Sequence, residues 1–96
     1  MKIDRARAQR AFADYAAHYN TADPKVKLKI DHTYRVAALC SRIAESLSLP
    51  QQDIDLAWLS GILHDVGRFE QLRRWDTFKD AESMSHAALG IEVLFG

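Results

Sequence analysis

The sequence contains one cysteine, two prolines and four glycines, and its 13 basic and 13 acidic side chains cancel. The single cysteine, Cys40, excludes a disulfide framework within the chain. Because Cys40 lies in an apolar helical pattern, we interpret it as a small buried hydrophobic residue. A balanced charge provides no overall field that would attract nucleic acid or an anionic membrane, so we expect no nucleic-acid platform. A local phosphate pocket is compatible with this balance.

Long apolar runs are also lacking. The longest uncharged, mainly apolar stretch has about eight residues, Leu56 to Leu63, far fewer than the ~20 that a membrane-spanning helix needs. The N-terminus is charged and no apolar segment follows it, so we expect no signal peptide, no membrane partner and a cytoplasmic location. A chain of 96 residues, 48% of them apolar, is long enough for one small globular domain.

Helical periodicity runs through the sequence and restarts at its two prolines. Asp23 before Pro24 is typical of an N-cap followed by the first residue of a helix, and Pro50 stands near the start of the next helix. The alternation typical of β-strands does not occur, so the fold class is all-α. The expected helices cover residues 3–19, 25–47 and 51–65, a short segment near 69–74, and a final apolar segment capped by Ser83 or Ser85.

The second and third helices differ in how their apolar residues are arranged. In the second helix these residues recur every three or four positions and form one stripe, which we expect to face the core. The third helix has almost no polar face after its first turn, which predicts a buried, central helix. The residues of the stripe are Leu28, His32, Val36, Leu39, Cys40, Ile43 and Leu47.

Asp65 occupies an unfavourable place for a carboxylate. It ends the most apolar helix, where it meets the negative end of the helix dipole. Burying an unpaired charge is costly, so Asp65 should be protonated or bind a cation. His64 beside it offers an imidazole suited to a divalent metal. Gly67, two residues later, is well placed for a sharp turn that would let both side chains converge.

His32 should approach this pair from the second helix. A short turn joins the second and third helices, so they run antiparallel, and the start of one lies near the end of the other. His32 would then meet His64 and Asp65 at one end of the hairpin. These residues predict a divalent-metal site, against the alternative of an ordinary buried histidine and a solvated aspartate.

Two segments resemble the HD superfamily of metal-dependent phosphohydrolases, namely His32-Thr33-Tyr34-Arg35-Val36-Ala37 and Ile62-Leu63-His64-Asp65-Val66-Gly67-Arg68. Members share the pattern His, then His-Asp, then a later Asp, on a helical core. The segment from Asp80 to Gly90 is similar to a stretch with a His-Ala and Gly pair in many bacterial members. The resemblance covers roughly residues 26–95.

The resemblance implies an HD-domain-like helical bundle in which His32, His64 and Asp65 are metal ligands. Mixed nitrogen and oxygen ligands suit Mn, Fe, Co, Ni, Zn or Mg, and the sequence does not choose among them. The later Asp of the family pattern has no counterpart, because Asp76 and Asp80 both precede the next histidine of the pattern.

That histidine, His86, matches a position that serves a second metal or the substrate in some relatives, so we also treat it as a candidate metal ligand. The alternative is a histidine that is exposed or caps the final helix. Arg35, about one turn from His32, and Arg68, just after the His-Asp pair, are candidates for holding a phosphate. The basic residues of the polar connection read as solvated surface, or as a rim or lid: Arg73, Arg74 and Lys79.

We therefore predict a metal-dependent phosphohydrolase whose partner is a small phosphorylated molecule, either a nucleotide or another small phosphate ester. An alternative is a non-catalytic regulatory module of the HD type that binds a metal or a phosphorylated ligand, which the missing Asp favours. A third reading is a structural helical domain with a vestigial site.

Residues 1–96 are expected to form a single, partial HD domain, with an N-terminal helix in 1–20 and the metal-site core in 25–95. The sequence ends on an apolar helix with no charged last turn. We interpret the chain as a fragment or truncated product whose C-terminal part is missing, or as a piece that another copy completes. If it is whole, we expect a homo-oligomer that covers the apolar C-terminal helix at Ile91, Val93, Leu94 and Phe95.

Overall fold

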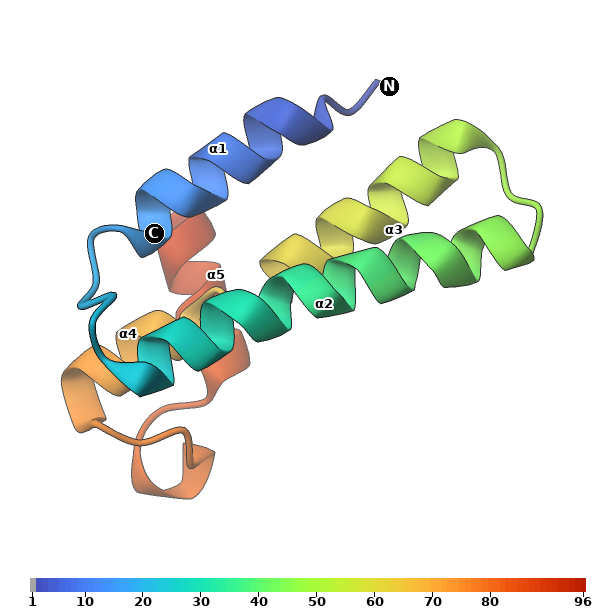
Figure 1. Ribbon diagram of the computed structural model, residues 1–96. Coiled ribbons are helices and arrows are strands. Elements are labelled where there is room, and N and C mark those ends of the chain that lie inside the picture. Colours follow the sequence, from blue (N-terminus) through green and yellow to red (C-terminus); the bar gives the residue numbers. More distant parts are fainter. Residues whose placement is uncertain (1) are drawn as a thin grey trace.

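The computed structural model describes residues 2–96, which form α-helices and one 3-10 turn and contain no strand (Figure 1). The all-α prediction is confirmed, and each expected helix is present with ends that differ by a few residues. The elements are α1 (Arg5–Ala16), α2 (Pro24–Ser46), α3 (Gln51–Leu63), α4 (Gly67–Trp75), η1 (Asp80–Glu82) and α5 (His86–Phe95).

The helix starts follow local signals in the sequence. Asp23 is the N-cap of α2, and its side chain accepts a hydrogen bond from the backbone N–H of Lys25. Pro24 takes the first helical position, where its missing N–H costs nothing. Of the two serines expected to cap α5, Ser85 rather than Ser83 does so.

Helices α2 and α3 run antiparallel as a hairpin (Figure 1), with close approach of their backbones at Gly61. A Cβ on Gly61 would lie 2.6 Å from the Cα atom of Ala37, which leaves no room for a side chain. Apart from Val26 near its start, the buried residues of α2 are accordingly small, since large side chains would hold the helices apart. They include Thr33, Ala37, Ser41 and Ala44.

The prediction of which face of α2 packs in the core is wrong. Leu28, Leu39, Ile43 and Leu47 are 47–66% exposed. The four buried small residues each follow a stripe residue by one position, which rotates the buried face by about 100°. The close contact with α3 selects the small face and turns the large apolar residues outward. The His32 side chain, on the stripe, is therefore 38% exposed rather than enclosed in the core.

Helix α3 is central but is covered on one side only. Ile54, Trp58 and Ile62 are buried, whereas Leu56 and Leu63 are exposed. The expectation of a helix buried on all sides is wrong for the side that faces away from the core. Both helices thus direct part of their apolar surface toward solvent. As a result, the end of the hairpin is open to solvent at His32.

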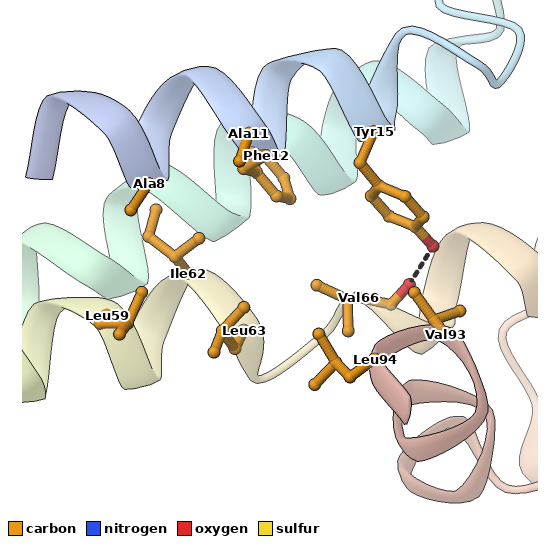
Figure 2. Close-up of a pocket in the computed structure, with 10 residues that line it drawn as sticks. All are labelled: Ala8, Ala11, Phe12, Tyr15, Leu59, Ile62, Leu63, Val66, Val93 and Leu94. Carbon is orange, nitrogen blue, oxygen red and sulfur yellow. Dashed lines mark hydrogen bonds between the residues drawn. The ribbon is translucent and has the colours of Figure 1, made fainter. Parts of the chain in front are cut away.

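Helix α1 packs alongside the hairpin on α3 (Figure 1), and Phe12 anchors it in the core. An apolar cavity remains between α1, α3 and α5 (Figure 2). At its edge the Tyr15 hydroxyl donates a hydrogen bond of 2.8 Å to the carbonyl oxygen of Val66. Because Val66 follows Asp65, this bond ties α1 to the turn that carries the predicted site.

Helices α4 and α5 meet with their backbones in contact at Gly67. A Cβ on Gly67 would collide with the carbonyl oxygen of His86 and lie 2.5 Å from the backbone nitrogen of Gly90. The chain turns between α3 and α4 as expected, but Gly67 does not make this turn through a left-handed conformation, because no glycine among residues 2–96 has a positive φ. Its missing side chain instead brings the start of α5, and with it His86, beside the end of α3.

No helix in the described part of the chain is long and apolar enough to cross a membrane. On α5, Leu89 is buried while Ile91, Leu94 and Phe95 are exposed. That another copy of the chain covers these residues stays a prediction.

Candidate metal centre

Asp65 is a buried carboxylate in the turn between α3 and α4. Its Oδ2 lies 3.5 Å from Nε2 of His32 and 3.2 Å from Nε2 of His64. One ligand atom from each of the three residues lies within 4.8 Å of the other two. The predicted meeting of His32 with the His64–Asp65 pair at one end of the hairpin is confirmed.

The His64 ring is held in one orientation by the backbone. Its Nδ1 is hydrogen-bonded to the carbonyl oxygen of Gly61. A carbonyl oxygen only accepts, so Nδ1 carries the hydrogen, and in the neutral form of such a ring the lone pair lies on Nε2, which faces Asp65. A lone pair and a carboxylate oxygen 3.2 Å apart repel each other unless a cation or a proton lies between them. The geometry thus fits a cation at this point.

The surroundings of His32 favour the neutral form of its ring, in which it can bind a metal ion. Burial lowers the pKa of His32, the charge of Lys29 lowers it further, and the carboxylate of Asp65 opposes both effects. A lowered pKa favours the uncharged imidazole at neutral pH, which is the form that binds metals. Two neutral imidazoles and one carboxylate are a donor set that suits a divalent transition-metal ion.

Two basic side chains also contact Asp65. The Lys29 ammonium lies 3.4 Å from Oδ2 and 5.1 Å from the ring centroid of Phe78. The Arg68 Nε lies 3.8 Å from Oδ1, and this buried nitrogen has no hydrogen-bond partner among residues 2–96. Arg68 was a candidate from the sequence, but Lys29 was missed. The signal that could have identified Lys29 is its position one turn before His32 on the same helix.

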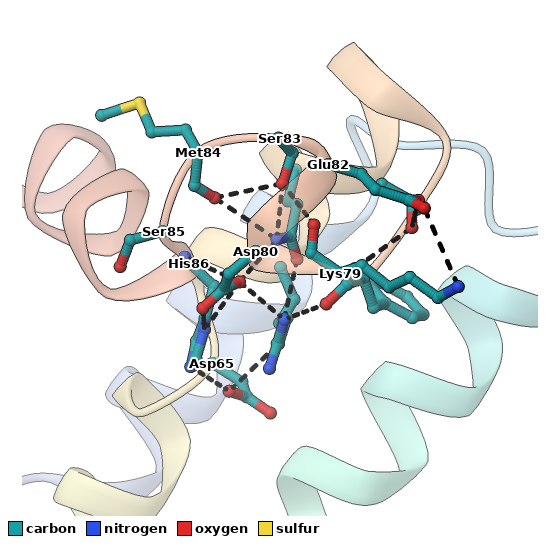
Figure 3. Close-up of polar contacts among 12 residues, drawn as sticks. Asp65, Lys79, Asp80, Glu82, Ser83, Met84, Ser85 and His86 are labelled. Atoms are coloured by element: carbon teal, nitrogen blue, oxygen red, sulfur yellow. Dashed lines mark hydrogen bonds and ion pairs between the residues drawn. The ribbon is translucent and has the colours of Figure 1, made fainter.

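His86 lies near the other carboxylate oxygen of Asp65, Oδ1, whereas the hairpin histidines lie near Oδ2 (Figure 3 shows His86 and Asp65). Its Nε2 lies 3.7 Å from Oδ1 of Asp65, and its Nδ1 lies 3.0 Å from Oδ2 of Asp80. Hydrogen bonds from His86 and then from Gln71 hold the pKa of Asp80 below its usual range. Gln71 is fully buried, and nothing in its polar surroundings in the sequence marked it.

The other basic candidates lie apart from this cluster. Arg35 is exposed on α2, and its charge is one of the smaller causes that lower the pKa of His32. Arg73 and Arg74 bond to Glu70, and Lys79 pairs with Glu82. The contacts of these last three fit the interpretation as solvated surface.

The two aspartates of the polar connection have other partners. Asp76 ends α4 with a φ of 50° and pairs with Lys25. Asp80 bonds to His86 and Gln71. Within residues 2–96 the group that gathers at Asp65 contains no further carboxylate ligand.

The comparisons with known proteins agree with this geometry. A family model described as the HD domain matches residues 30–95. Such domains are typically metal-dependent hydrolases, and the matched segment includes His32, the His64–Asp65 pair and His86. Comparisons with curated proteins and with solved structures gave no match.

Proposed function

The chain belongs to the HD domain family, and we propose that it is a metal-dependent phosphohydrolase acting on a nucleotide or a small phosphate ester. The observation that carries this proposal is the convergence of His32, His64 and Asp65, whose ligand atoms lie within 4.8 Å of one another. Two imidazoles directed at one buried carboxylate form an arrangement that a divalent cation would complete.

A divalent ion bound there supplies Lewis acidity, which lowers the pKa of a water molecule and polarises a phosphoryl oxygen. His64, fixed by its bond to the Gly61 carbonyl, and His32 would hold the ion together with Asp65. His32 lies on α2, and His64 and Asp65 directly follow α3, whose backbone contacts that of α2 at Gly61, so the three residues are held close together.

Lys29 and Arg68 support the assignment of a phosphate substrate. Both now compensate the charge of Asp65. Once a bound cation compensates that charge, the Lys29 ammonium becomes available to an anion at the same point, while Nη1 of Arg68 keeps its hydrogen bonds to Gln71, Phe78 and Asp80. The unpartnered, buried Nε of Arg68 is a hydrogen-bond donor suited to a phosphate oxygen.

A phosphate-release assay tests this function. The purified protein is incubated with nucleoside mono-, di- and triphosphates in the presence of Mn²⁺ or Co²⁺. Release is expected with at least one of these classes and should be lost in Asp65→Asn. The control is His18→Ala, because His18 lies on the surface beyond α1, bonded to the Asp14 carbonyl. Equal release by the Asp65→Asn protein would contradict the proposal.

The second candidate function is a regulatory module that binds a metal or a phosphorylated ligand without turning it over. The observation in its favour is that Asp76 and Asp80 are engaged elsewhere, which leaves three ligand groups at the cluster within residues 2–96. A nucleotide that raises the melting temperature of the metal-loaded protein, with no phosphate released, would favour this function.

A further inference from the structure

We propose that Asp80 is a positioning residue, which fixes the hydrogen of the His86 ring on Nδ1 and so directs the lone pair of Nε2 at Asp65. This inference rests on the proposed function, since it assigns His86 to the same centre. From the sequence, Asp80 was excluded as the later Asp of the family pattern, because it precedes His86, and it received no other role. The structure gives it a different contact.

Nδ1 of His86 faces both oxygens of Asp80 and lies nearer to Oδ2, since it is 3.3 Å from Oδ1 and 3.0 Å from Oδ2 (Figure 3). Oδ1 accepts hydrogen bonds from Nε2 of Gln71 at 2.7 Å, from Nη1 of Arg68 at 3.3 Å and from the backbone N–H of His86 at 3.3 Å. Oδ2 faces Nδ1 of His86 at 3.0 Å. A carboxylate can only accept, so Nδ1 of His86 must be the donor.

Asp80 itself is held in place by the buried side chain of Gln71. Gln71, which is fully buried, also donates to the hydroxyl of Ser83 at 2.9 Å and lies 3.3 Å from the Met84 carbonyl oxygen. These bonds fix the segment between η1 and α5 over α4. The carboxylate therefore has little freedom to turn away from His86, and its orientation is set before any ligand arrives.

The fixed Nδ1–H has a consequence on the other side of the ring. In a neutral imidazole with hydrogen on Nδ1, Nε2 has a free lone pair. That lone pair lies 3.7 Å from Oδ1 of Asp65, whereas His32 and His64 face Oδ2 of the same carboxylate. Partners of this kind, which orient a histidine from behind, set which nitrogen is available at a metal centre.

Replacing Asp80 by asparagine should move the hydrogen of the neutral His86 ring from Nδ1 to Nε2. The amide oxygen is expected at the Oδ1 position, because three donors converge there. The amide NH₂ then takes the Oδ2 position and donates to Nδ1 of His86. Because Nδ1 lies nearer to the Oδ2 position than to the Oδ1 position, at 3.0 Å against 3.3 Å, we expect the hydrogen to move to Nε2, where it faces Asp65 and removes the lone pair from the site. The substitution is isosteric, so the packing around it is preserved.

The experiment is ¹⁵N NMR of histidine-labelled, metal-free protein at mildly alkaline pH, where long-range ¹H–¹⁵N correlations identify the protonated ring nitrogen. The His86 signals are assigned by their loss in His86→Gln. We expect Nδ1–H in the original protein and Nε2–H in Asp80→Asn. The control is Glu82→Gln, an exposed carboxylate of η1 that contacts Thr77 and Lys79, and it should leave the His86 signals unchanged.

Nε2–H or a doubly protonated ring in the original protein would overturn the inference, and so would an unchanged tautomer in Asp80→Asn. The tautomer of the original protein can be determined whether or not the Asp80→Asn protein folds. Because the measurement uses neither metal nor substrate, its failure is distinct from an absence of phosphate release, which would count against the proposed function alone.

Discussion

Replacing Gly67 by alanine is expected to force α4 and α5 apart. The added Cβ has no free space, because it meets the carbonyl oxygen of His86 and the backbone nitrogen of Gly90. Backbone atoms of packed helices cannot rotate away as the end of a side chain can, so the helices themselves must shift. His86 would move with α5, away from Asp65.

The loss of folding free energy in Gly67→Ala can be estimated from this geometry. Overpacking a well-packed core typically costs about 1–3 kcal/mol, and a clash with backbone atoms belongs at the upper end, at about 3 kcal/mol. In a domain of this size each kcal/mol lowers the melting temperature by about 4–8 °C, so Gly67→Ala should melt roughly 12–24 °C lower.

Gly90→Ala is the matched control on the facing helix. A Cβ on Gly90 has its nearest neighbours at 3.7 Å, which is ordinary van der Waals contact. Glycine inside a helix is less favourable than alanine by roughly 0.5–1 kcal/mol, so this variant should gain about that amount. Urea unfolding followed by circular dichroism measures both. A Gly67→Ala protein as stable as Gly90→Ala would refute the reasoning.

Three further variants test other contacts. A hydrogen bond from Arg73 is the main cause that lowers the pKa of Glu70 from 4.5 to about 2; Glu70 therefore stabilises the fold above pH 4.5, and this contribution disappears as the pH falls toward 2. In urea unfolding across that range, Glu70→Gln should remove about 1–2 kcal/mol of acid dependence. Tyr15→Phe deletes the donor to the carbonyl oxygen that follows Asp65 and should lower the free energy of unfolding by about 1–2 kcal/mol in urea. Lys29→Gln removes a cation 3.4 Å from Asp65, and calorimetry should show roughly tenfold tighter Mn²⁺ binding.

The helices and the convergence of the ligands could be predicted because local signals determine them. Asp23 and Pro24 start α2 through a side-chain cap and a fixed φ. The short turn between α2 and α3 allows only an antiparallel pair, which brings His32 to the end of the next helix. The antiparallel pairing itself requires no knowledge of which helix faces are buried.

The face of α2 that packs could not be predicted from its apolar residues. The contact depends on Gly61, which admits the backbone of Ala37 and favours small neighbours over leucines. Lys29 was also missed, because the expected stripe did not include it. Gln71 gave no periodic signal, because its burial arises only when the segment before α5 folds over it.

The central claim is that His32, His64 and Asp65 hold one divalent ion between them. Calorimetric titration of metal-free protein with Mn²⁺ and Co²⁺ measures this directly, with His18→Ala as the control. Stoichiometric binding is expected for the original protein and the control, and it should be lost in His64→Ala and Asp65→Asn. Undiminished binding by these two variants, or no binding of either ion by the original protein, would contradict the claim.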